Sequence, residues 1–205
     1  FKAHGVFAFL MLAAISLYRL PDFVMGPMAN PFYHDIGLTK DVVGTVRASV
    51  GLITSLIGIA AGGFAALRFG YMRALIVGGF LQVIAVAAYA ILAYSGNSIE
   101  IFAGVMALDS FAMGFAGVAL VSYMSSLTSL GYTATQYALL ASTYAWAGKI
   151  LKGFSGAVVE WLSASHGLIN AYAIFFVGAG LIGVPAILLF ALLNTRQKAA
   201  AAAAS

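Results

Sequence analysis

The sequence predicts an all-α membrane protein that crosses the bilayer six times. Hydrophobic residues make up 63% of the 205 residues and charged residues only 8%, whereas a soluble globular domain carries roughly 25% charged residues. Six apolar segments each reach the ~20 residues that a helix needs to cross a hydrocarbon core about 30 Å thick. They are too long for the alternating strands of a membrane barrel, and helices satisfy their own backbone polar groups in lipid.

The six predicted helices follow one another with short connections. Thr39 precedes the second helix and Thr133 the fifth, where a threonine side chain can cap free N–H groups of the first turn. We expect residues 1–198 to form the bundle and residues 199–205 to be a low-complexity tail. The predicted helices comprise residues 5–28, 41–67, 73–94, 99–127, 135–162 and 169–193.

The charges indicate a lipid bilayer as the partner and do not indicate nucleic acid. The net charge is +4, but the basic residues are scattered, with no polybasic run of the kind that binds phosphate backbones. Cysteine is absent, which excludes disulfides and thiolate chemistry. With a cytoplasmic N-terminus, Lys40 lies in an outside loop, and the bias of basic residues toward the inside favours both termini being cytoplasmic. The inside residues are Lys2, Arg68, Arg73, Arg196 and Lys198.

A short internal repeat relates the two halves of the chain. Residues 36–39 read Ile-Gly-Leu-Thr before the second predicted helix, and residues 130–133 read Leu-Gly-Tyr-Thr before the fifth. With six crossings these stretches lie on opposite faces of the membrane, as in a 3+3 inverted repeat. The first helix of each unit carries an acid, Asp22 or Asp109. Transporters are commonly built in this way, with sites near the repeat interface.

Two opposite charges and a proline interrupt the first predicted helix. A charge at the bilayer centre costs about 2.5–3.5 kcal/mol on insertion scales, so Arg19 and Asp22 are expected to face a bundle interior or a watery cavity. Pro21 removes a backbone hydrogen bond and predicts a kink. We predict that Tyr18, Arg19 and Asp22 line a substrate or proton path. The alternative is that Arg19 and Asp22 merely pair along the helix.

Asp109 and two lysines are the other candidates for the path. Asp109 lies near the middle of the fourth predicted helix, where a carboxylate could load and release a proton. A permanent ion pair with Lys149 is the alternative. Lys149, Lys152, Gly156 and Glu160 recur at helical spacing and are expected to share one helix face, where two lysines suit an anionic substrate. Alternatively, Lys152 and Glu160 extend toward the membrane interfaces.

A serine motif raises the possibility of an enzyme. Residues 153–156 read Gly-Phe-Ser-Gly and match the motif of rhomboid proteases, which also have a six-helix core. A nucleophilic serine needs a histidine base within hydrogen-bond reach. His166 follows the motif beyond the helix end, and His4 and His34 lie at helix margins. We therefore expect no enzymatic activity and interpret these small residues as packing positions.

The connection between the second and third predicted helices resembles the cytoplasmic loop signature of the major facilitator superfamily, Gly-x-x-x-Asp-Arg-x-Gly-Arg-basic. Residues 63–73 read Gly-Phe-Ala-Ala-Leu-Arg-Phe-Gly-Tyr-Met-Arg. Leu67 replaces the aspartate and Tyr71 an arginine, a degeneracy usual in the loop of the second half. The resemblance implies a gating loop that contains Gly63, Arg68, Gly70 and Arg73.

Two further stretches are similar to AmpG-type muropeptide permeases, in which Tyr-Arg-x-x-Asp and Ala-Thr-Gln-x-Ala-Leu-Leu-Ser recur. Residues 18–22 read Tyr-Arg-Leu-Pro-Asp, and residues 134–142 read Ala-Thr-Gln-Tyr-Ala-Leu-Leu-Ala-Ser. Arg19, Asp22 and Lys149 fall on the matching motif positions. The likeness implies the C-terminal six-helix half of a twelve-helix major facilitator, with the N-terminal half missing. A chain that begins with Phe1 is then interpreted as a fragment or a processed product.

This resemblance implies proton-coupled import of anionic anhydro-muropeptides across a bacterial inner membrane by alternating access. The proton gradient would be the energy source, with no cofactor and no metal. Related acetyl-coenzyme A transporters share the pattern, so acetyl-coenzyme A or another small organic anion is an alternative solute. A six-helix sensor or assembly subunit, whose charges serve only helix pairing, is the alternative outside transport.

Overall fold

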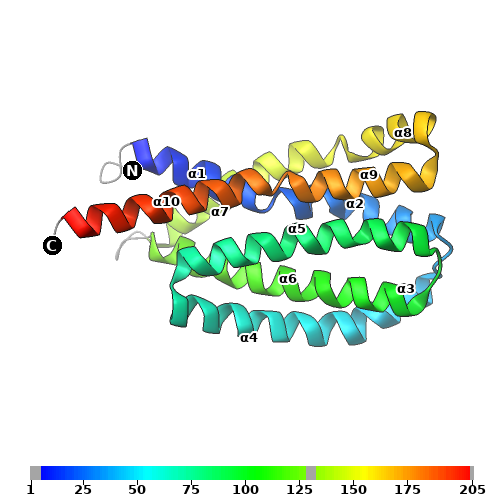
Figure 1. Cartoon of the computed structure of the whole chain (residues 1–205), viewed down its shortest axis with the longest axis horizontal. Helices are drawn as coiled ribbons and strands as arrows, with labels where there is room; N and C mark the ends of the chain where they lie inside the picture. The colour runs from blue at the N-terminus through cyan, green and yellow to red at the C-terminus, as the bar shows by residue number, and fades with distance from the viewer. Residues whose placement is uncertain (1–5, 128–132, 204–205) are drawn as a thin grey trace.

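The chain forms a bundle of long helices that run side by side between two ends (Figure 1). This computed structural model describes residues 6–127 and 133–203, with side chains for 10–127, for 148–196 and for some positions between them. Its elements are α1 (Val6–Tyr18), α2 (Leu20–Asp35), α3 (Lys40–Val46), the π-helical segment η1 (Arg47–Gly51), α4 (Leu52–Phe69), α5 (Tyr71–Ser95), α6 (Ile99–Ser126), α7 (Thr133–Lys152), α8 (Ser155–His166), α9 (Leu168–Leu181) and α10 (Val184–Ala203).

Within the described residues, four stretches are long and apolar enough to cross a membrane, which makes the chain a multi-pass membrane protein. The first predicted span is divided into α1 and α2 and the fifth into α7 and α8, and neither is among these four. The four are Lys40–Phe69, Tyr71–Ser95, Ile99–Ser126 and Leu168–Arg196.

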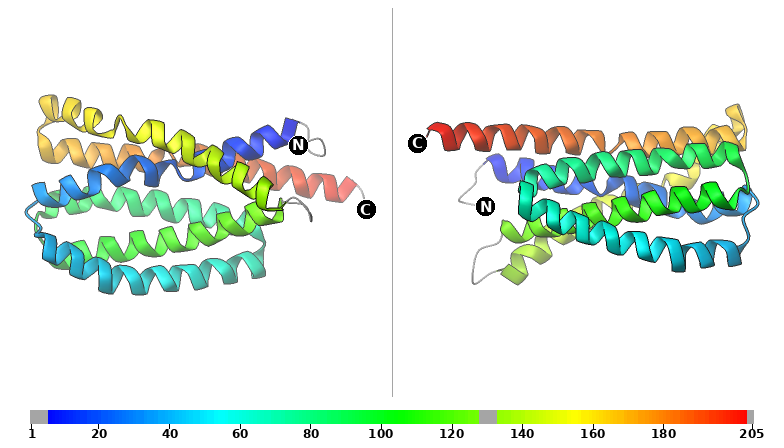
Figure 2. Two further views of the ribbon diagram at one scale, coloured as in Figure 1. Left: turned by 180° about the vertical axis from the view of Figure 1, so that it is seen from behind. Right: turned by 60° about the horizontal axis from the view of Figure 1, so that its bottom comes forward.

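The helices pack in a defined order. α6 lies between α4 and α5, and α5 also packs against α9 and α10. α7 packs against α1 and α2 and crosses them obliquely (Figure 2). α1 begins and α10 ends at the same end of the bundle, whereas α3 lies at the opposite end (Figure 1).

The predicted kink in the first span is confirmed, but the predicted end of that helix is wrong. Arg19 forms a turn between α1 and α2, and Pro21 stands in the first turn of α2. α2 then continues through Pro27 and Pro31 to Asp35 instead of ending near residue 28. Prolines are tolerated inside membrane bundles because neighbouring groups satisfy the backbone that they free.

A tight turn also divides the fifth predicted span. Gly153 N–H donates to the Ile150 carbonyl (3.1 Å) and Phe154 N–H to the Leu151 carbonyl (3.0 Å), bonds that end α7 before α8 begins. The prediction of one continuous face is therefore wrong, because its two lysines belong to α7 and its other two members to α8. The face was to contain Lys149, Lys152, Gly156 and Glu160.

The interrupted spans pack against one another near their breaks. α9 ends at Leu181 and α10 begins at Val184, and a Cβ built on Gly183 between them would lie 2.9 Å from Cγ of Pro21. At the start of α8, the buried Ser155 hydroxyl donates to the Val24 carbonyl of α2 (2.8 Å). The breaks thus leave room for neighbouring segments and supply partners to them.

The connections between helices include one of the two predicted threonine caps. Thr39 Oγ1 accepts the N–H of Val42 (3.4 Å), which confirms the predicted cap of α3. α7 begins at Thr133, whose side chain lies outside the described residues. Gly70 alone joins α4 to α5 at φ +86°, a conformation that favours glycine.

Glycines bring α4 and α6 into close backbone contact. Gly62 of α4 faces Phe115 of α6, and a Cβ on Gly62 would lie 2.6 Å from the Phe115 carbonyl oxygen. Gly58 faces the Phe111 backbone in the same way. Such small residues let the backbones of two membrane helices approach closely. Next to Gly62 in sequence, Gly63 has room for a Cβ, whose nearest neighbour would be Val118 Cγ1 at an ordinary contact distance of 3.8 Å.

We expect Gly62→Ala to destabilise the protein by about 1–3 kcal/mol, because the added methyl group would push α4 away from a backbone that cannot yield. Gly63→Ala is the matched control and is expected to be neutral or slightly stabilising. Thermal unfolding in detergent measures both. Equal melting temperatures for the two variants would contradict the close α4–α6 contact.

Candidate functional site

Polar side chains occupy a level of the bundle that separates two apolar clusters. The cluster toward the α3 end includes Val24 of α2, Val86 of α5 and Met106 of α6. The other cluster includes Tyr18 of α1, Leu75 of α5 and Ala116 of α6. Between these limits lie the four residues that we call the central polar layer: Arg19, Asp22, Gln82 and Asp109. The predicted depth of the charged residues agrees with this placement.

The first part of the central polar layer joins α2 to α5. Arg19 Nη1 lies 2.9 Å from Asp22 Oδ2, without the alignment of a hydrogen bond, and Gln82 Nε2 donates to the same oxygen (2.8 Å). The ion pair between Arg19 and Asp22, which was the alternative to a role in a substrate or proton path, is therefore present. Both charged side chains are still about one fifth exposed, at 20% and 19%.

Gln82 was missed by the sequence analysis. Its side chain is 2% exposed, and its Oε1 atom has no hydrogen-bond partner among the described residues. An unpaired buried acceptor is costly, which singles out this position. The signal that could have identified Gln82 is its position as a lone amide in the middle of an apolar predicted helix. The sequence analysis gave more weight to the charged residues of other helices.

A chain of hydrogen bonds leads away from Asp109, the fourth residue of the central polar layer. The Tyr89 hydroxyl donates to Asp109 Oδ2 (3.0 Å), and the Tyr33 hydroxyl donates to the Tyr89 oxygen (3.1 Å). Beyond Tyr33, the Arg47 guanidinium carbon lies 5.5 Å from the centre of the tyrosine ring. Among the described residues no ion pair joins Asp109 to Lys149. Asp109 is thus connected toward the α3 end of the bundle.

Tyr18 and the two lysines lie apart from these contacts. The buried Tyr18 hydroxyl donates to the Leu75 carbonyl (3.0 Å), and its ring meets Phe190 edge to face at 5.6 Å. These contacts hold α1 against α5 and α10. Lys149 and Lys152 are exposed in the last turn of α7, where cations interact favourably with the helix dipole. The path roles of the three residues stay predictions.

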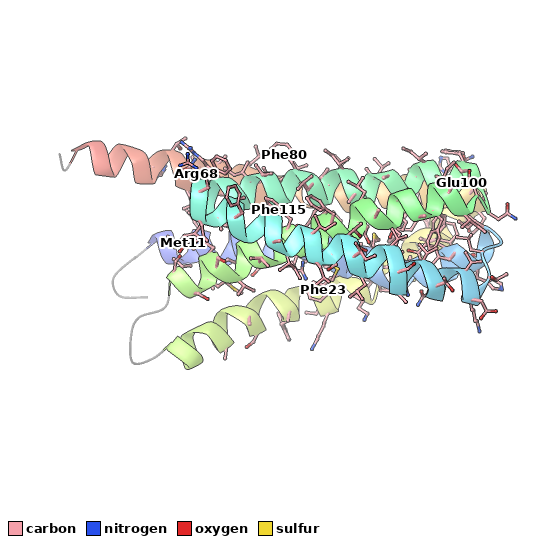
Figure 3. All side chains as sticks on the ribbon, turned by 90° about the horizontal axis from the view of Figure 1, so that it is seen from below. Met11, Phe23, Arg68, Phe80, Glu100 and Phe115 are labelled. Carbon is pink, nitrogen blue, oxygen red and sulfur yellow. The ribbon has the colours of Figure 1, made fainter. Side chains whose placement is uncertain are left out.

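The predicted gating residues surround the α4–α5 connection. Gly63 lies inside α4, Arg68 in its last turn and Arg73 in the first turn of α5, with Gly70 between the helices. Both arginines are exposed, and Arg68 lies at the end of the bundle where α1 begins (Figure 3). Their role in gating stays a prediction.

The serine motif has a packing role in the described structure. Ser155 is 1% exposed and its hydroxyl donates to the Val24 carbonyl. The His166 ring pairs instead with its neighbour Ser165 (2.7 Å from Nδ1 to Oγ). Neither histidine with a described side chain, His34 or His166, contacts Ser155.

Fold and site together define a multi-pass helical membrane protein that keeps charged groups inside its bundle. No protein-family model matches the chain. The chain is 30% identical to the putative transporter AmpG 4 of Rickettsia conorii over 190 residues. This alignment covers 93% of this chain and 44% of that protein. The chain is also 29% identical to the anhydromuropeptide permease of Escherichia coli K12 over 178 residues. This alignment covers 86% of this chain and 35% of that protein.

These alignments confirm the predicted resemblance to AmpG-type transporters over most of the chain. A third relative, the putative transporter AmpG 3 of Rickettsia prowazekii, is 28% identical over 165 residues, or 80% of this chain and 39% of that protein. The chain spans less than half the length of the relatives described here.

We expect Arg19→Gln to destabilise the protein by up to about 3–5 kcal/mol, because it leaves the Asp22 carboxylate without its counter-ion. Asp22→Asn should also destabilise, whereas the double variant should be less destabilised than the sum of the two, with a coupling of about 0.5–3 kcal/mol. Unfolding midpoints in detergent give the cycle. Strict additivity would show that the ion pair contributes nothing to stability.

Proposed function

We propose that the chain is the C-terminal six-helix half of a major facilitator type transporter that imports anionic, muropeptide-like solutes with protons. The missing N-terminal six-helix half would complete the protein. The observation that carries the proposal is Asp109, a carboxylate held between two apolar clusters and hydrogen-bonded to Tyr89. Such groups inside membranes mark ion paths and proton relays. The names of the relatives support the solute class.

The arrangement of the elements supports a 3+3 inverted repeat. Asp22 belongs to the first span of the first unit and Asp109 to the first span of the second, and both lie in the central polar layer. The second span of the first unit begins with α3 and that of the second unit with α7, and these two helices begin at opposite ends of the bundle (Figure 1). Units inserted upside down relative to one another have this geometry.

We further propose that the protein lies in a bacterial inner membrane with the α1 and α10 ends cytoplasmic. Arg68, Arg73 and Arg196 then lie on the cytoplasmic side, in keeping with the positive-inside bias. Lys40 lies at the opposite, outer end, at the start of α3. In alternating access, this half would rock against the missing half around the central polar layer. The proton gradient would supply the energy without a cofactor.

Uptake of labelled anhydro-muropeptide into vesicles that hold the natural full-length protein tests the proposal, with and without an inward proton gradient. We expect accumulation that depends on the gradient. Uptake of acetyl-coenzyme A or another organic anion instead would change the solute and leave the transport class intact. If a folded, inserted protein moves neither solutes nor protons, a sensor or assembly role would replace transport.

We expect Asp109→Asn to abolish gradient-driven accumulation while solute binding or exchange remains measurable, because asparagine cannot take up and release a proton. Glu100→Gln is the matched control, since Glu100 is an exposed carboxylate in the first turn of the same helix, at the α3 end of the bundle (Figure 3). It should leave accumulation unchanged. Undiminished accumulation by Asp109→Asn would rule out an essential proton role for Asp109.

A further inference from the structure

A basic cavity opens where α2 ends and α3 begins. Its volume of about 600 Å³ lies within the ~300–1,000 Å³ range of small-molecule sites. Asn30, Tyr33, His34, Lys40 and Arg47 supply polar or charged groups to its wall, and none of the described residues that line it is an aspartate or glutamate. A cavity with this lining favours an anion.

No described acid forms an ion pair with Lys40 or Arg47, the two strong cations of this cavity. Asp35 pairs with His34 (3.2 Å from Nδ1 to Oδ1) and accepts a hydrogen bond from Tyr172 (2.7 Å), and it does not line the cavity. Asp41 lies in the first turn of α3, also outside the lining. Among the described residues, neither Lys40 nor Arg47 has a carboxylate within ion-pair distance.

The backbone and a tyrosine ring hold Arg47 at the cavity. Arg47 begins η1, which replaces one turn of the α-helix between α3 and α4, and isolated π-helical turns frequently occur at functional sites. The guanidinium carbon lies 5.5 Å from the centre of the Tyr33 ring, so a cation–π contact orients it. The side chain is nevertheless exposed. An oriented guanidinium that forms no ion pair with a described carboxylate is suited to bind a carboxylate of a solute through two parallel hydrogen bonds.

We propose that this cavity binds a carboxylate group of the transported solute, with Arg47 as its main contact and Lys40 as a second cation. This assignment rests on the proposed transport function and names the solute chemistry that the outer end of this half recognises. Tyr33, which lies under the Arg47 guanidinium, donates to Tyr89, and Tyr89 donates to Asp109. The carboxylate site is therefore connected by side-chain contacts to the proton carrier proposed above.

Competition by two forms of one solute tests this assignment in the full-length protein. The probes are an anhydro-muropeptide with free carboxylates and the same compound with its carboxyl groups amidated. We expect the wild-type protein to prefer the acid about tenfold or more, and Arg47→Gln to lose this preference. Arg47→Lys should retain part of it. The control is Arg196→Gln, in the exposed end of α10 outside the cavity, which should keep the full preference.

A second measurement requires no variant. Phenylglyoxal modifies exposed arginines, so mass spectrometry should find Arg47 modified several-fold more slowly when the acid is present, with no such protection by the amide. Equal uptake of acid and amide by the wild-type protein, or a full preference in Arg47→Gln, would overturn the carboxylate site while transport stands. If the protein transports neither compound, slower modification of Arg47 in the presence of the acid would retain the carboxylate site. A lack of such protection would overturn both the carboxylate site and the proposed transport function.

Discussion

The cost of placing a charge inside an apolar bundle is the constraint on which the rest of this structure depends. The chain meets this cost with side-chain partners beside each buried carboxylate. Asp22 forms an ion pair with Arg19 and accepts a hydrogen bond from Gln82, and Asp109 accepts a hydrogen bond from the Tyr89 hydroxyl. Tyr89 in turn accepts a hydrogen bond from Tyr33, so the partner of this one carboxylate begins a polar connection that reaches the exposed Arg47.

The interruptions of the helices follow from the same need to fit polar and bulky groups into a closely packed bundle. α1 gives way to α2 at Arg19, and the Pro21 ring then occupies space beside Gly183, where α9 gives way to α10. Ser155, at the start of α8, supplies its hydroxyl to a carbonyl of α2. Each of these contacts lies at or next to a helix end.

Tertiary contacts gave one selected residue a different role and brought forward one that the sequence analysis had not selected. Tyr18, expected to line a path, is buried against Phe190 and donates to the Leu75 carbonyl. Arg47, which the sequence analysis did not select, lines a cavity and forms no ion pair with a described carboxylate. The difference arises because a sequence reports which residue types are costly in lipid but not which neighbours satisfy them. Those neighbours come from helices far apart in the chain.

The sequence by itself determined the membrane class, the helical content, the kink at Pro21 and the likeness to AmpG-type transporters, because these depend on composition, local backbone chemistry and short motifs. Only the tertiary structure decided where the fifth and sixth spans break, that Gln82 joins Asp22, and that two tyrosines connect Asp109 with Arg47. The last two features depend on side-chain contacts between α2, α5, α6 and η1, and no periodicity within a single helix encodes which face of another helix it will meet.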